Sequence, residues 1–454
     1  MKFSRLHLLA CSMVFSFLLS CKKEKSDLEV IAPEEVVVAP VNASLSDSVV
    51  YFTRDLYLWY KQLPQNFSQQ SLSSPNAFME AIRQYSQEPG FTGPVDHWSF
   101  AMKKAEWDGV SAGVAGDFGM NVSYFKTEDN LRVMSVEKFS AAGRAGVHRG
   151  WKISKINGNS NISFSNKDVV NKAVYNSTST LFTFQKPDNS VVDITLRAGG
   201  YIETPLFLDT VYSIGNKKIG YMVFNSFLGD TTEVYKRFNT VFNKFSGQDV
   251  KDLVIDLRYN GGGYVSVQEK LANYLVNPSA NGKVMMKQMF NDKLSQYNET
   301  TYFKKTGTLN PARILFIVSG NTASASELLI NSLKPYVETK LVGPSNTHGK
   351  PVGFFPHPVL DWYIFPVSFR TVNSNGQGNY FGGMVPDNKA SDGIDKDWGD
   401  LEEASLASAI RYITGGAFRS REGDLFVESP LATEANKTFE ARLFKGSIDT
   451  RRMN

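Results

Sequence analysis

The stretch Ile314–Glu327, with the sequence ILFIVSGNTASASE, determines the expected fold class. Its first five residues are apolar and predict a buried strand, and the apolar residues that resume at Leu328 predict a helix over 324–333. A helix N-terminus presents unpaired N–H groups and a positive dipole end, which favour negative charge on the Ser324 oxygen or on a nearby oxyanion. The alternative is that the Ser and Thr residues here serve only as helix caps, a role that both favour.

A second strand-to-helix connection has the sequence LVIDLRYNGGG over 253–263. A short buried strand leads directly into three glycines, and a helix is expected over 265–275. Glycines let backbone N–H groups face a ligand, as an oxyanion hole requires, so Gly261 and Gly262 are candidate donors. A plain strand-to-helix turn is the alternative. Together with a strand expected at 219–224, this alternation predicts an α/β core over residues 201–416.

A third segment, Thr347–Gly353, places a lysine between a glycine and a proline and beside apolar residues. Burial would lower the pKa of the Lys350 amine and leave it neutral, able to accept a proton. The alternative is an exposed lysine in a turn, where most lysines lie. The neighbouring His348 is expected to be a surface or structural residue.

The rest of the chain divides by composition and periodicity. Apolar residues at helical spacing predict a small helical N-terminal domain over 44–108, and short alternating runs separated by turn signals predict a β-rich domain over 109–200. Residues 417–454 are polar and weakly periodic, and are expected to be either a docked extension or a loose tail. The expected fold class is therefore multidomain α+β.

The N-terminus resembles a bacterial lipoprotein signal. A short basic start, an apolar run and Leu18-Leu19-Ser20-Cys21 predict a signal peptide over 1–21, lipidation of Cys21, and a flexible tether over 22–43. Lys22 favours the outer membrane, facing the periplasm or the cell surface. The alternative is an ordinary signal peptide with an incidental cysteine. Cys11 is the only other cysteine, so no disulfide is expected in the mature chain.

Taken together, the three core segments resemble the C-terminal processing peptidases, also called tail-specific proteases. The resemblance implies a peptidase core of the ClpP/crotonase-like type, with Ser324 as nucleophile and Lys350 as general base. It also implies an oxyanion site at Ala325 with Gly261 or Gly262. Two positions depart from the family pattern, because Pro335 stands in place of an Asp and Phe354 in place of a Gln. Glu327, one helical turn from Ser324, is a candidate orienting residue.

The β-rich domain resembles a PDZ domain. The small-residue stretch 140–147 matches the short PDZ helix, and Lys155-Ile156-Asn157-Gly158 matches the strand and turn that follow it. The resemblance implies that a loop binds a peptide carboxylate through backbone N–H groups while the peptide pairs as an added strand. A spacer without ligand is the alternative. The candidate peptide-binding residues are Phe118, Gly119, Met120, Asn121 and Val122.

The expected function is that of a serine endopeptidase that hydrolyses exported or unfolded polypeptides through an acyl-enzyme, with no metal or cofactor. The five histidines are scattered and no His-Glu-x-x-His motif occurs, which disfavours a metallopeptidase. The net charge of +4, without long basic runs, disfavours nucleic acid as a partner. The alternative is a catalytically silent peptide- or ligand-binding lipoprotein on the same fold. The sequence leaves the oligomeric state open.

Overall fold

The computed structural model describes residues 44–67, 74–354, 356–418, 425–426, 428–440 and 444–450. The expected signal peptide, Cys21 and the tether lie outside this part of the chain. No helix within the described residues combines the length and the apolar character needed to cross a membrane.

A six-stranded sheet forms the core, and its strand order is β21-β16-β15-β11-β10-β9. All neighbouring pairs are parallel except β9 with β10. The strands expected at 219–224, 253–257 and 314–318 are β10, β11 and β15, with small shifts at their ends. The bounds are β9 Leu206–Ile214, β10 Lys217–Phe224, β11 Asp252–Asp256, β15 Arg313–Ile317, β16 Glu338–Gly343 and β21 Asn388–Lys389.

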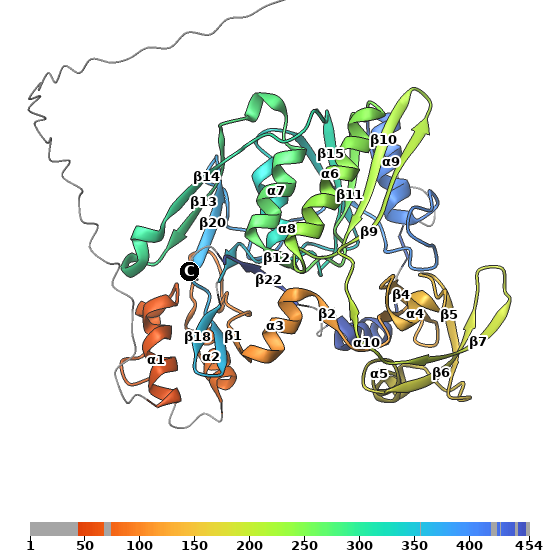
Figure 1. Ribbon diagram of the computed structural model, residues 1–454, viewed down its shortest axis with the longest axis horizontal. Helices are drawn as coiled ribbons and strands as arrows, with labels where there is room; N and C mark the ends of the chain where they lie inside the picture. Colours follow the sequence, from red (N-terminus) through yellow and green to blue (C-terminus); the bar gives the residue numbers. More distant parts are fainter. Residues whose placement is uncertain are drawn as a thin grey trace, which may run out of the picture. The chain divides into compact units, whose positions relative to one another are not determined.

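Helices cover both faces of this sheet (Figure 1). Alternate residues of the parallel strands pack against α9 (Ala404–Gly415) in one apolar cluster. On the opposite face, a methyl group at Gly220 of β10 would lie 3.2 Å from the ring of Phe245 in α6 (Thr231–Gly247). Two further helices, α7 (Val265–Leu275) and α8 (Ala325–Leu333), follow α6 in a layer of packed helices. Both begin directly after the segments singled out in the sequence.

The N-terminal region is mostly helical, with α1 (Leu45–Leu56), α2 (Pro75–Ile82) and α3 (Lys104–Ala112). Ser74 caps α2 by accepting a hydrogen bond from Ala77 N–H, and Pro75 occupies the first helical position. This region also contributes a strand, because β1 (Phe100–Lys103) pairs with β19 (Trp362–Phe365) beside β18 (His357–Val359). Residues far apart in the sequence thus share a three-stranded sheet.

A four-stranded sheet with the order β14-β13-β20-β17 was not expected from the sequence. Its last strand lies just after Lys350 and fixes the direction in which the chain leaves that residue. The bounds are β13 Val284–Phe290, β14 Glu299–Tyr302, β17 Val352–Gly353 and β20 Phe369–Asn373.

The β-rich region contains a five-stranded antiparallel sheet with the order β3-β4-β5-β6-β7. Of the stretch expected to be helical at 140–147, only Ala141–Arg144 forms a helix, α4, which Ser140 caps. A second helix, α5 (Lys167–Tyr175), packs on β3. The strands are β3 Met120–Tyr124, β4 Leu131–Val136, β5 Lys152–Ile156, β6 Ser179–Gln185 and β7 Val191–Arg197. Two short strands, β2 (Val114–Ala115) and β8 (Tyr201–Ile202), pair where the chain enters and leaves the β-rich region.

A buried cluster of charges joins this region to the core. The Arg149 guanidinium donates to Asp392 (2.6 Å) and to the hydroxyl of Tyr259 (2.8 Å). Asp392 also pairs with Arg258 (2.8 Å), which in turn pairs with Glu403 (2.8 Å). Because both guanidinium groups are buried, this network depends on the carboxylates that surround it.

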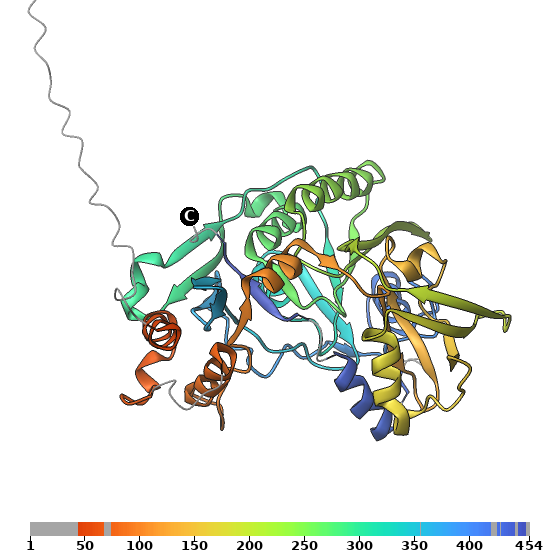
Figure 2. The ribbon, with the colours of Figure 1, turned by 60° about the horizontal axis from the view of Figure 1, so that its bottom comes forward.

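The described residues of the C-terminal extension are docked. Helix α10 (Pro430–Glu440) packs on β3, and Phe439 contributes to the apolar core of the β-rich region. In Figure 2 this blue helix lies alongside the yellow α5. Strand β22 (Gly446–Ile448) pairs in parallel with β12 (Gly262–Tyr264), and Figure 1 shows the two strands next to each other below α7 and α8.

Candidate active site

Ser324 is the residue that immediately precedes α8. Its φ of +59° is unusual for a residue with a side chain and places strain at this turn. Residues on either side of Ser324 bond to one carbonyl of the glycine loop: Ala323 N–H donates to Asn260 O (3.0 Å), and Ser326 Oγ donates to the same oxygen (3.0 Å). The candidate nucleophile therefore lies between the end of β15 and the loop after β11.

Glu327 joins the Ser324 turn to the Lys350 segment. One carboxylate oxygen accepts from the N–H groups of Ser324 (2.8 Å) and Lys350 (2.8 Å). The other accepts from Gly349 N–H (2.7 Å) and the Thr347 hydroxyl (2.6 Å). Burial raises the pKa of the Glu327 carboxyl, and these hydrogen bonds oppose the rise. The candidate orienting residue thus acts on the backbones of both candidate catalytic residues.

The Lys350 amine is enclosed by apolar and aromatic groups. Only 1% of the residue is exposed, and the amine lies 3.9 Å from the centre of the Phe354 ring and 5.5 Å from that of Trp98. Burial lowers the pKa of this amine well below its ordinary value, while the carboxylates of Asp96 and Glu327 oppose the fall. Phe354 stands where the family has a Gln, so an aromatic ring here takes the place of a polar neighbour. Such a shift in the pKa favours the neutral amine, which can accept a proton.

Residues from the N-terminal region complete the surroundings of Lys350, and the sequence analysis did not identify them. The buried Asp96 carboxylate accepts from Tyr57 OH (2.9 Å) and from Ser99 Oγ (2.5 Å). Trp98 Nε1 donates to His348 Nε2 (2.9 Å). No local motif marks these residues, because only the pairing of β1 with β19 brings them near the core.

His348 has a partner for each ring nitrogen. Nε2 accepts from Trp98, and Nδ1 lies 3.2 Å from the carbonyl oxygen of Gly320, as in a neutral ring protonated at Nδ1. Burial, together with the charge of Lys445, lowers the pKa of His348 to about 4. Because both ring nitrogens have partners, His348 has a structural role and helps to position Trp98.

The candidate oxyanion residues converge. A methyl group placed on Gly262 would lie 3.0 Å from the Ala325 nitrogen and 2.4 Å from the Gly446 carbonyl oxygen, so no side chain fits there. Gly262 N–H donates to Asn260 Oδ1 (2.9 Å), whereas Gly261 O accepts from Gly446 N–H (2.9 Å). Ala325 is the first residue of α8, where backbone N–H groups have no partner within the helix.

Both candidate catalytic side chains bond to the C-terminal segment. The hydroxyls of Ser324 and Ser447 share a hydrogen bond of 2.7 Å, and Lys350 Nζ donates to the carbonyl oxygen of Lys445 (3.0 Å). Ser324, like Lys350, is only 1% exposed. The sequence analysis gave this segment no role in the site.

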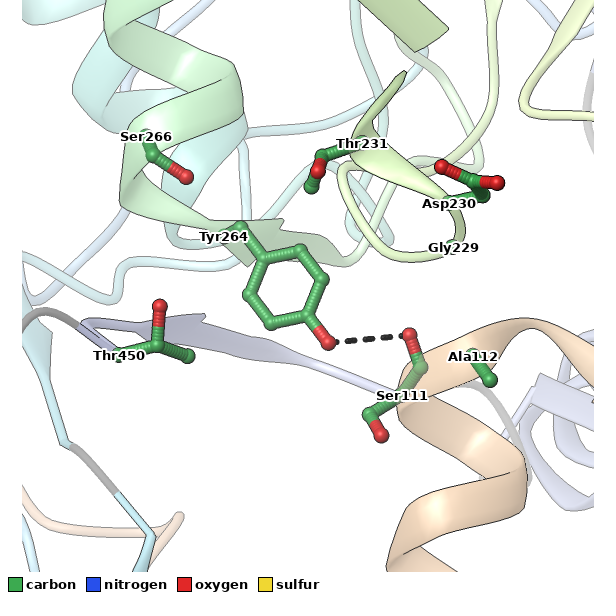
Figure 3. A pocket seen from close by; sticks show the side chains of 8 residues that line it. All are labelled: Ser111, Ala112, Gly229, Asp230, Thr231, Tyr264, Ser266 and Thr450. Atoms are coloured by element: carbon green, nitrogen blue, oxygen red, sulfur yellow. Dashed lines mark hydrogen bonds between the residues drawn. The ribbon is translucent and has the colours of Figure 1, made fainter. Parts of the chain in front are cut away.

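A pocket of about 470 Å³ lies at the end of the β12–β22 pair. Figure 3 shows the ring of Tyr264 at its centre, with the hydroxyl donating to the Ser111 carbonyl (3.1 Å). Thr450, which follows β22, lies at one side, and Asp230 and Thr231 at the start of α6 lie at the other.

The candidate peptide-binding residues lie at the start and along the edge of the β-rich sheet. Phe118 is buried in its core, Met120 pairs with Val136, and Asn121 Nδ2 donates to Ser135 Oγ (3.1 Å). Two backbone donors expected to face a peptide have partners within the chain: Gly119 N–H donates to Asp117 Oδ1 (2.7 Å), and Val122 N–H donates to Tyr175 OH (3.1 Å).

Further along β3, the N–H of Tyr124 donates to Asn436 Oδ1 (2.8 Å), and Asn436 Nδ2 donates back to the Tyr124 carbonyl (2.9 Å). Helix α10 therefore covers the strand edge at which an added peptide strand was expected. Throughout the described ranges, no group of three or more His, Cys, Asp or Glu side chains is arranged to hold a metal ion.

Known proteins share sequence and fold with this chain. Residues 218–389 match the family model described as Peptidase family S41. The chain is 30% identical over 268 residues to the "Probable CtpA-like serine protease" of Staphylococcus aureus strain N315, which is 57% of this chain and 49% of that protein. It is 24% identical over 257 residues to the protein of the same name from Staphylococcus saprophyticus, which is 56% and 49% of the two chains. The chain thus spans about half the length of these curated relatives.

The fold agrees with a crystal structure from Bacteroides fragilis NCTC 9343, of a protein assigned to the S41 proteases. The TM-score is 0.67 at 20% sequence identity, over 82% of this chain and 97% of that one. At 20% sequence identity, this similarity shows a shared fold and does not show a shared activity. The multidomain α+β architecture expected from the sequence is confirmed.

Proposed function

From the match of residues 218–389 to the model of peptidase family S41, we propose that the chain is a serine endopeptidase in which Ser324 is the nucleophile and Lys350 the general base. One observation carries the proposal: the single buried carboxylate of Glu327 binds the backbone N–H groups of both Ser324 and Lys350. A strained serine at a helix N-terminus and an enclosed amine are thereby held in one rigid unit. Such a unit suits nucleophilic catalysis.

In the proposed reaction, neutral Lys350 takes the proton of the Ser324 hydroxyl as its oxygen attacks the scissile carbonyl. The developing oxyanion is stabilised by the N–H groups of Ala325 and Gly261, since the Gly262 N–H already donates to Asn260 Oδ1. One such donor contributes about 3–4 kcal/mol to lowering the barrier. Protonated Lys350 gives its proton to the leaving amine, so that an acyl-enzyme remains. Water then attacks the acyl carbonyl, again with Lys350 as base, and Ser324 regains its proton.

Exported or unfolded polypeptides are the proposed substrates. We propose that the mature protein is anchored in the cell envelope by a lipid. Support comes from the signal-like N-terminus with Cys21, which also underlies the proposed outer-membrane location. The β-rich region would recruit extended chains at the edge of β3, which α10 covers in this structure. The peptidase reaction is preferred to a silent binding protein because Ser324, Lys350 and the glycine loop are all present, and Glu327 links the backbones of Ser324 and Lys350.

The test compares the full chain, and a chain ending at Glu440, with their Ser324→Ala and Lys350→Ala variants. Each is incubated with an unfolded protein, and the fragments are identified by mass spectrometry. Ser165→Ala and Lys236→Ala, two exposed positions, are the matched controls. Cleavage that survives in the controls and is lost in both site variants is the expected result. Absence of cleavage by both unmutated chains, with peptide affinity retained, would overturn the proposal in favour of the binding protein.

A further inference from the structure

The C-terminal segment Phe444–Thr450 lies in the candidate active site as an extended strand with partners on both edges. On one side β22 pairs with β12, and Gly446 N–H donates to Gly261 O (2.9 Å). On the other side, Phe354 N–H donates to Ser447 O (3.0 Å), and Asp449 N–H donates to Phe354 O (3.2 Å). These are main-chain bonds of the kind that an extended peptide makes when it adds to a strand, and they depend little on its side chains.

The same segment passes directly across the proposed catalytic groups. Lys445 offers its carbonyl to the Lys350 amine, and Ser447 offers its hydroxyl to Ser324. Between them, Gly446 lies against the glycine loop: a methyl group on Gly262 would lie 2.4 Å from the Gly446 carbonyl oxygen. Three consecutive residues thus contact the base, the glycine loop and the nucleophile, in that order. The Ser324 oxygen bonds to the Ser447 hydroxyl and not to a peptide carbonyl group. A segment bound in this way blocks the site as an inhibitor does.

The segment is buried as deeply as the groups it covers. Ser447, Ile448 and Asp449 are all buried, and so are Ser324 and Lys350. A second polypeptide cannot pair with β12 or reach Ser324 while the segment stays in this position. Access to the site therefore requires that the segment leave.

The preceding part of the extension covers the other expected peptide-binding edge. Asn436 of α10 satisfies both backbone groups of Tyr124 on β3, and Phe439 packs near the rings of Tyr124 and Tyr175. One extension therefore covers both the strand edge of the β-rich region and the catalytic groups.

We propose that Phe444–Thr450 is an intramolecular pseudosubstrate that keeps the peptidase site closed until it is displaced or removed. The proposal rests on the proposed function, whose regulation it describes. It also assigns the substrate track: an incoming polypeptide lies parallel to Gly262–Tyr264, between that strand and Phe354, with one backbone carbonyl in the position of the Gly446 carbonyl.

The first arm of the test compares the full chain with the chain ending at Glu440 on a fluorogenic unfolded protein. A tether that supplies about 1 mM effective concentration to a peptide with a Kd of about 0.1 mM would lower activity about tenfold. Removal of the segment should therefore raise kcat/KM about tenfold. The synthetic peptide FKGSIDT, added in trans, should inhibit the shortened chain competitively, and a scrambled peptide should not.

The second arm keeps the full chain and replaces Gly446 and Asp449 by proline, which removes the two N–H groups that bond to Gly261 and Phe354. The double variant should be activated like the shortened chain. Thr438→Ala, at an exposed position of α10, should behave like the full chain.

Binding of the peptide FKGSIDT, measured by calorimetry, tests the pseudosubstrate independently of the proposed peptidase activity. Binding to the shortened chain and exclusion from the full chain, without cleavage by either, would support the pseudosubstrate and refute the peptidase. Cleavage by both chains at equal rates, or failure of the shortened chain to bind the peptide, would overturn the pseudosubstrate.

Discussion

The hydroxyl of Ser324 lies 2.7 Å from the hydroxyl of Ser447, a residue 123 positions later in the chain. This hydrogen bond places the end of the chain on the candidate nucleophile. It also explains why a serine expected to attack external substrates is buried.

Ser447→Ala should make the nucleophile more reactive. The variant loses one hydrogen bond, which contributes about 1 kcal/mol and so about a fivefold change in how firmly the segment is held. We expect labelling of Ser324 by a fluorophosphonate probe to become several-fold faster. Thr438→Ala is the control. Unchanged labelling in Ser447→Ala would show that this hydroxyl does not help hold the segment in place.

Glu327→Gln should lower activity and change its pH dependence. An amide cannot accept from all of the N–H groups that the carboxylate binds, and a buried donor left without a partner costs about 1–3 kcal/mol. The variant also removes a negative charge that raises the pKa of Lys350, so the pKa of that amine should fall further. The acid limb of the profile of kcat/KM against pH should therefore move to lower pH.

This shift separates an effect on Lys350 from simple misfolding. A variant that is merely less stable would lose activity at every pH, with the limb in its original position. Glu402→Gln, at an exposed carboxylate, is the matched control and should leave the profile unchanged.

Lys350→Met should abolish cleavage and raise thermal stability near neutral pH. An unfolded lysine binds a proton up to about pH 10.4, whereas burial lowers the pKa of this amine in the folded protein. Between the two pKa values the unfolded state binds more protons, so the stability of the unmodified chain rises with pH in that window. Methionine removes this titration.

The Tm of Lys350→Met should therefore exceed that of the unmodified chain at pH 7, and the gap should narrow towards pH 10. Differential scanning calorimetry across this range measures the gap. Lys236→Met, at an exposed lysine, should show no comparable trend. A gap that is constant with pH would mean that Lys350 is charged in the folded protein.

Arg149→Met should weaken the connection between the β-rich region and the core. The change leaves Asp392 with one guanidinium partner instead of two, and breaking a buried pair costs about 3–5 kcal/mol. We expect the free energy of unfolding in urea to fall by about that amount. Arg237→Met, at an exposed arginine of α6, should have little effect. Equal stability of the two variants would show that the network contributes little.

The sequence by itself predicted the elements whose signals are local. The apolar run before Ser324, and the strand that leads into Gly261 and Gly262, each indicated a buried strand followed by a helix. Both are present as β15–α8 and β11–α7, with β12 between the glycines and α7. Such signals are readable because burial on a sheet and the start of a helix depend on residues within a few positions of each other. The roles of Ser324 and Lys350 stay predictions that the experiments above test.

Only the tertiary structure decided what surrounds these residues. Glu327 was one candidate orienter, and the fold showed that it binds the backbones of both Ser324 and Lys350. Asp96 and Trp98 reach Lys350 through the pairing of β1 with β19, and Ser447 reaches Ser324 through the pairing of β22 with β12. Strand pairing between distant segments is set by backbone hydrogen bonds and by burial in the assembled core. The short polar segment that ends the chain carries no periodicity of its own that could have placed it there.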